Sequence, residues 1–408
     1  MKRTLLAVAI LIAGSYSFGQ NINDHKVSFS YIQLPLKQID TQYDKYSVSI
    51  EHAYQKANED STNIFNTREE VAMEFFKSQI EMYYAQRDSL DKIHLTNLAK
   101  WEKNVNAGIK KPDGTELDRP TPPIYPSAPE YPNLEAPILH TEYDEANASE
   151  RILLAGYEQG EGQVEITITL QPIRDIRVVS GKKGTGSSTK YTYSAKYVLP
   201  IGVKVASPSQ GILLETTLWE GVMSYNMKDQ KSQYDHELYM MENKEVFYRE
   251  LEAYARSKAM AQTSDYLNNQ FGFVPKTRVA EIYSVKSFKS HDYSDVTDAF
   301  TKTTFALQAV GTDRDRSGAM SKINEAITVL ESILTESNLS DNKSRVNDKV
   351  TAMLQCNLAE LYVWKGEFDQ ADALVNIAKN SGVGKAKRHL QDETGFYKDQ
   401  RSRWEANY

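Results

Sequence analysis

The sequence predicts an α+β protein in which a β-rich N-terminal region precedes an α-helical C-terminal region. Three observations support this prediction. Apolar and polar residues alternate over residues 26–52 and 151–222, as in strands with one solvent-exposed face. Apolar residues recur at helical spacing over residues 60–107 and again from residue 237 onward. Between these segments, residues 112–137 hold eight of the thirteen prolines, which can continue neither a helix nor a central strand.

The composition bounds the possible classes of protein. The chain has 408 residues, of which 40% are hydrophobic and 25% are charged, and this excludes a polytopic membrane protein and a fully disordered chain. The net charge of −7 provides no electrostatic attraction for nucleic acid or anionic lipid. The single cysteine, Cys356, excludes an intramolecular disulfide and a metal site built from several cysteines.

Residues 1–19 have the pattern of a cleavable signal peptide. Lys2 and Arg3 provide a positive start, Leu5–Gly14 is an apolar run, and the small residue Gly19 precedes Gln20. The run is shorter than the roughly 20 residues of a membrane span, and the segment has no cysteine to carry a lipid. Export without disulfides is typical of a bacterial envelope. We therefore expect a soluble periplasmic or extracellular protein that is not a lipoprotein.

Residues 20–230 are expected to form one β-rich domain, either an antiparallel sheet or a sandwich. The strands predicted over residues 26–52 would complete a sheet formed by residues 151–222. A helix over residues 60–107, about 70 Å long at 1.5 Å per residue, would be inserted between them together with the Pro-rich segment 112–137. That segment is either a docking site for an aromatic groove or a stiff return path along the helix, and we favour the return path.

The remaining residues are predicted to be mainly helical. Residues 231–290 form a connecting region, with a helix over 237–270 and a short strand at Arg278–Ser287. Residues 291–380 contain helical hairpins, of which the first pairs Asp295–Val310 with Ser317–Glu336. Residues 381–408 are expected to be a polar C-terminal tail.

The most specific internal pattern covers residues 347–380. Its members are small or aromatic residues at fixed spacing, namely Leu358, Ala359, Tyr362, Gly366, Phe368, Ala371 and Ala378. The pattern resembles the tetratricopeptide repeat, a helix–turn–helix unit of 34 residues, and it extends loosely back to residue 295. The resemblance implies that Tyr362 fills the space between paired helices and that Gly366 allows the turn. It also implies a concave surface that holds a peptide or protein.

No segment carries a complete catalytic or cofactor-binding motif. In the loop over residues 181–188, Ser187 follows Gly186 where a nucleotide-binding loop needs a lysine, and the loop precedes a predicted strand. The pair His236-Glu237 begins like a zinc-protease motif, but Met240 occupies the second ligand position. No two of the seven histidines lie within four residues of each other. We therefore assign no catalytic, cofactor-binding or metal-ligating residue, and we leave the binding residues unassigned.

These observations favour an exported, non-catalytic protein–protein interaction or scaffold protein of the bacterial cell envelope. Its partner would be an envelope protein or peptide, bound on the inner side of residues 295–380 with neighbouring tyrosines, and nucleic acid would not bind. The mature chain would have no integral membrane span, and peripheral association with an envelope assembly is compatible with these observations. The alternative is a secreted carbohydrate-binding or glycan-processing protein, for which the 25 tyrosines would supply contact area.

Overall fold

The computed structural model describes residues 21–185, 190–288 and 290–408, and it has the α+β class that the sequence predicts. The predicted signal peptide, residues 1–19, lies outside the described residues. In chain order the elements are β1 (Asn21–Gln33), β2 (Lys45–His52), α1 (Ala53–Asn106), α2 (Glu145–Glu150), β3 (Glu158–Gln159), β4 (Val164–Leu170), β5 (Arg174–Lys183), β6 (Lys190–Val198), β7 (Ile201–Ser207), β8 (Gly211–Leu218), β9 (Met223–Asn226), α3 (Gln233–Phe271), β10 (Val274–Ser287), α4 (Ser294–Gln308), α5 (Ser317–Leu334), α6 (Asp348–Lys365), α7 (Phe368–Asn380) and α8 (Gly384–Asn407).

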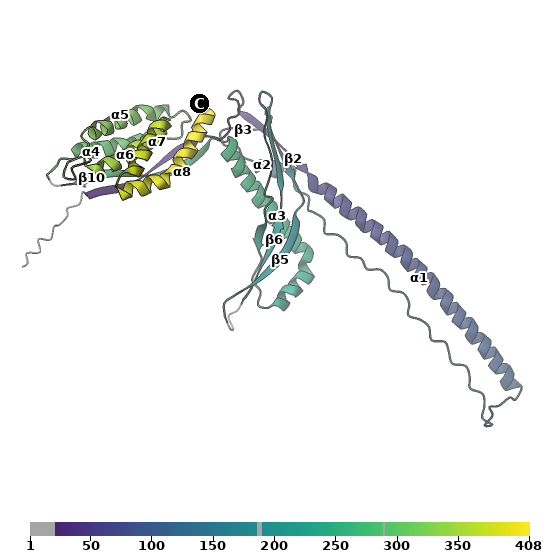
Figure 1. Cartoon of the computed structure of the whole chain (residues 1–408). Coiled ribbons are helices and arrows are strands. Elements are labelled where there is room, and N and C mark those ends of the chain that lie inside the picture. Colours follow the sequence, from purple (N-terminus) through teal and green to yellow (C-terminus); the bar gives the residue numbers. More distant parts are fainter. Residues whose placement is uncertain (1–20, 186–189, 289) are drawn as a thin grey trace, which may run out of the picture.

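These elements form three parts that are separated in space (Figure 1). We call β1, β10 and α4–α8 the helical module, and β2–β9 with α2 and α3 the sheet module. The helix α1 and the following segment, residues 107–144, form the projection, and we call residues 107–144 the arm. Each module has its own cluster of buried apolar residues, whereas the projection has almost none.

The sheet module contains a five-stranded sheet in the order β3-β2-β4-β7-β8 and a three-stranded sheet in the order β5-β6-β9. Residues of β4 alternate between buried and more exposed positions, so Val164, Ile166 and Ile168 face the core. The helix α3 contributes Leu251, Met260 and further side chains to the same core. One side of α3 is therefore held against the sheet, which explains how a helix of such polar composition is stable.

The projection is an insertion between two neighbouring strands of one sheet. Strand β2 pairs with β4 in parallel, with Val48 opposite Ile166, and the connection between them contains α1, the arm, α2 and the short strand β3. The predicted insertion is therefore present. The strand pairs of the sheet module are mainly antiparallel, as expected, but β2 pairs in parallel with β3 and β4, and a parallel pair requires a long crossover connection of this kind.

The helical module combines two helical hairpins, a C-terminal helix and a two-stranded ribbon. Helices α6 and α7 correspond to the helix–turn–helix predicted over residues 347–380, and Gly366 between them has φ of 86°. Three members of the repeat pattern, Leu358, Tyr362 and Ala371, are buried. The region α4–α8 is compatible with a helical repeat.

Three predicted elements differ from the structure. Strand β1 does not join the sheet of β2, but pairs antiparallel with β10, so that Val27 lies opposite Ala280. The predicted short strand, Arg278–Ser287, is the second part of β10, which starts at Val274 and tolerates Pro275 near its beginning. Residues 381–408 are not a polar tail, since α8 occupies most of them and buries Leu390 and Tyr397.

Candidate interaction surface and junction pocket

The inner face of the helical hairpins is covered by the ribbon of β1 and β10. Strand β10 packs against α4 and α6, the first helix of each hairpin, and β1 packs against α4. From α6, the fully buried Asn357 accepts a hydrogen bond from the Tyr283 backbone N–H at 2.8 Å and donates one to the Tyr283 carbonyl at 2.8 Å. The ribbon of the chain itself therefore occupies the face of α4 and α6 on which the sequence predicts a bound partner, and partner binding there stays a prediction.

A buried polar cluster joins β10 to α6 and α8. The Glu360 carboxylate accepts two hydrogen bonds from Arg278, at 2.8 and 2.7 Å, one from Trp364 at 2.8 Å and one from Tyr397 at 2.9 Å. Arg278 also donates to Glu393 at 2.8 Å. Burial would raise the pKa of Glu360, but the charge of Arg278 and these hydrogen bonds outweigh it and hold the pKa below its ordinary value. Its hydrogen-bonding capacity is used within the module, which makes a structural role the simplest interpretation.

The groups that most often carry chemistry are dispersed or inaccessible. Cys356 is 1% exposed, and burial raises the pKa of its thiol to about 12, so the reactive thiolate is absent at neutral pH. Across the described residues, no group of three or more His, Cys, Asp or Glu side chains is placed to hold a metal ion. His236 stacks on the ring of Tyr193 at 3.6 Å, as a packing contact.

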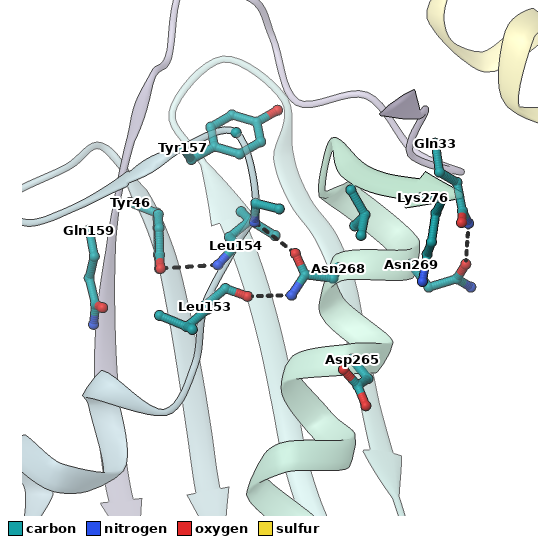
Figure 2. Close-up of a pocket in the computed structure, with 13 residues that line it drawn as sticks. Gln33, Tyr46, Leu153, Leu154, Tyr157, Gln159, Asp265, Asn268, Asn269 and Lys276 are labelled. Atoms are coloured by element: carbon teal, nitrogen blue, oxygen red, sulfur yellow. Dashed lines mark hydrogen bonds between the residues drawn. The ribbon is translucent and has the colours of Figure 1, made fainter. Parts of the chain in front are cut away.

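A pocket of about 710 Å³ lies where the sheet and helical modules meet (Figure 2). Several of its lining groups make hydrogen bonds within the sheet module. Tyr46 accepts a hydrogen bond from the Leu154 N–H at 3.1 Å, and Asn268 donates to the Leu153 carbonyl at 2.6 Å. Asn268 also accepts from the Ala155 N–H at 2.7 Å. These bonds fix the loop over residues 153–156 to the end of α3.

Helix α8 closes the same junction from the helical module. The guanidinium of Arg403, 3% exposed, donates to the Leu34 carbonyl at 2.8 Å and to the Asn269 side chain at 2.6 Å. Leu34 follows β1 and Asn269 lies at the end of α3, so one side chain binds both chain segments that run between the modules. We interpret the pocket as the space left at this joint.

The projection is fixed to the sheet module at its base. The side chain of Asn58 in α1 makes two hydrogen bonds to the backbone of His140, accepting from its N–H at 2.7 Å and donating to its carbonyl at 2.9 Å. The His140 ring lies 3.0 Å from Glu252 of α3, which also accepts a hydrogen bond from the buried Arg256 at 2.6 Å. The arm therefore returns to the body at a well-packed site, and α1 starts from a defined direction.

The arm runs back along α1, as Figure 1 shows. The ring of Tyr131 packs edge-on against Phe76 with centroids 5.4 Å apart, and Tyr125 donates a hydrogen bond to Asp91. Near the tip, Trp101 donates to the Leu117 carbonyl at 3.0 Å. The arm is thus the return path that the proline content favoured, with its aromatic residues directed at the helix.

The arm leaves one side of α1 uncovered, and that side is apolar. We call Ile64, Val71, Phe75, Met82 and Ile93 the apolar stripe; their exposed fractions are 55%, 63%, 64%, 61% and 56%. At 100° per residue, the five side chains fall within about 40° of the helix circumference. The residues that face the arm lie roughly 100° further round. Large apolar side chains exposed in a row along one side of a helix are typical of an interaction surface.

The sequence contained a signal for the apolar stripe. The helical pattern over residues 60–107 is satisfied mainly by residues that face the arm, such as Ala72, Phe76 and Tyr83, which are partly buried. The residues of the apolar stripe, from Ile64 to Ile93, form a second apolar series with the same helical period, displaced by about one residue from the series that faces the arm. Two apolar series on one helix indicate two covered sides, and the arm accounts for only one.

Comparison with known proteins adds no relative. No protein-family model, no curated protein and no solved structure matches this chain. Among the described residues, no helix combines the length and apolar character needed to cross a membrane. The function is therefore inferred from the geometry of the chain itself.

Proposed function

We propose that this chain is an exported, non-catalytic protein–protein interaction or scaffold protein of the bacterial cell envelope. The observation that supports this proposal most directly is the projection: α1 has 54 residues, is about 80 Å long, and carries the apolar stripe along its exposed side. Exposed apolar rows of this kind are found where another protein or a membrane binds. The arm stiffens the helix without covering the stripe.

The helical module acts as a brace in this proposal, with the tetratricopeptide-like hairpins α4–α5 and α6–α7 holding the ribbon instead of a separate peptide. The contacts of Asn357 and Glu360 with the ribbon support this role, since the side chains of both residues are hydrogen-bonded to β10 and are not available to bind a peptide. Peripheral association with an envelope assembly would then take place through the projection.

Export rests on the positive, apolar and small-residue pattern of residues 1–19. Protein recovered from the envelope fraction should begin at Gln20 or within a few residues of it, as determined by N-terminal sequencing. An intact Met1 in that fraction would contradict export by a cleaved signal.

The interaction proposal is tested by comparing partner capture between variants of the full mature chain. Phe75→Glu places a charge in the stripe, while Leu95→Glu places the same charge at a site that is 61% exposed on another side of α1. We expect Phe75→Glu to lose bound envelope protein and Leu95→Glu to retain it. Equal capture by both variants would contradict the proposal, as would hydrolysis of a glycan or peptide that a single carboxylate substitution abolishes.

A further inference from the structure

The central part of the apolar stripe, residues 71–93, is complementary to itself when reversed, while Ile64 lies eighteen residues from Met82 and would be opposite Lys100. Val71 and Ile93 each lie eleven residues from Met82, on opposite sides of it. Phe75 and Ser89 each lie seven residues from Met82. If two copies of α1 were antiparallel with Met82 opposite Met82, Val71 would meet Ile93, and the large Phe75 ring would meet the small Ser89. Large side chains opposite small ones allow close packing between helices.

The charges beside the stripe have the same reversed symmetry. Glu70 and Glu74 lie on one flank in the N-terminal half of α1, and Lys92 and Lys103 lie on that flank in the C-terminal half; all four are exposed. In the antiparallel arrangement, Lys92 of one copy lies between Glu70 and Glu74 of the other. Lys103 lies beside Asp60. Because the pair has two-fold symmetry, each of these contacts between the two copies occurs twice.

A parallel two-fold pair would not make these contacts. The charged flank of one copy would then lie on the opposite side of the stripe from the charged flank of the other, so Lys92 would not reach Glu70 or Glu74. The antiparallel pair also brings like charges together, with Glu81 close to its symmetry mate and Asp88 close to Glu74, but these carboxylates are exposed and screened by salt. The contacts of Lys92 and Lys103 with acidic residues therefore form only in the antiparallel orientation.

From this complementarity we propose that the apolar stripe joins two copies of the chain, α1 against α1 and antiparallel about Met82. The inference rests on the proposed function and specifies its partner as a second copy. A contact over residues 60–104, roughly 65 Å long and 10 Å wide, would bury about 1,300 Å² across both helices, which is the size of a stable interface.

The shape of the molecule permits this pairing. In Figure 1 the projection extends clear of both modules, with the arm along one side of α1. Pairing about Met82 would put the base of one projection next to the tip of the other, with the two bodies at opposite ends. The arm faces away from the stripe, so it keeps its contacts with Phe76 and Trp101.

Sedimentation of the mature chain at tens of micromolar tests the pairing. The wild-type chain should sediment as a dimer. The double variant Phe75→Glu, Met82→Glu should raise the dissociation constant at least about 100-fold, since it buries two unpaired charges per copy. The matched control Leu95→Glu should remain dimeric. Circular dichroism should be the same for all three, because every altered side chain is more than half exposed.

The orientation is tested by engineered cysteines, since the native Cys356 is buried. Met82→Cys should form a disulfide with itself in the dimer. Ile93→Cys should not, because its counterpart is about 33 Å away along the axis, but it should link to Val71→Cys when the two chains are mixed. Self-linking of Ile93→Cys would overturn the antiparallel arrangement.

A wild-type chain that sediments as a monomer at these concentrations would overturn the inference. If Phe75→Glu then still abolished capture of a different envelope protein, the proposed function would stand while self-pairing failed. If the variant changed neither property, both would fail.

Discussion

Asn357→Ala should destabilise the helical module strongly. The wild-type amide is fully buried and makes two hydrogen bonds of 2.8 Å to the backbone of Tyr283. Alanine would leave a buried N–H and a buried carbonyl of β10 without partners, and each costs about 1–3 kcal/mol. The expected loss is therefore about 2–6 kcal/mol in the free energy of unfolding.

Urea denaturation followed by the fluorescence of Trp364 and Trp404, both in the helical module, would measure this loss. The matched control is Asn376→Ala, an exposed asparagine of α7, where alanine should change stability by less than about 0.7 kcal/mol. Hydrogen exchange adds a local readout, since the Tyr283 amide should lose its protection. Equal unfolding midpoints for both variants would refute the described attachment of the ribbon to α6.

Two further substitutions test the helical module. Gly366→Ala should cost about 2–5 kcal/mol, because φ is 86° and a Cβ would lie 2.6 Å from the Trp404 ring, whereas Gly382→Ala, with open space, should be neutral; thermal melting compares them. Glu360→Gln should cost about 3–5 kcal/mol by leaving Arg278 incompletely paired. The pKa of Glu360 is depressed in the folded chain, so the stabilisation by its carboxylate is present above the ordinary pKa of 4.5 and is lost as pH falls below that value. The free energy of unfolding should therefore fall less steeply with decreasing pH in Glu360→Gln than in the wild-type chain.

Local patterns predicted the hairpins well. The spacing from Leu358 to Ala378 specifies two short helices around Gly366, and these contacts lie within one segment of chain, so the sequence alone carries the information. The alternation in residues 164–170 likewise indicates β4. The proline content identified the arm because proline excludes the alternatives.

Long-range partners could not be predicted in the same way. Strand β1 pairs with β10 about 250 residues later, and alternation shows which face of a strand is buried without showing which strand is its neighbour. Helix α8 was missed because it packs through Tyr397, Phe396 and Arg403, not through a row of aliphatic residues. The covered inner face of α4 and α6 follows from the same missing pairing.

The central claim, that the exposed side of α1 is an interaction surface, is tested most directly by photo-cross-linking in the native envelope. A photoreactive amino acid would replace Phe75 in the stripe or, as the control, Leu95 on another side of the helix. The account predicts a covalent adduct from position 75, with the mass of two copies and the cross-link near Ser89, and little adduct from position 95. No adduct from position 75, or equal adducts from both positions, would contradict it.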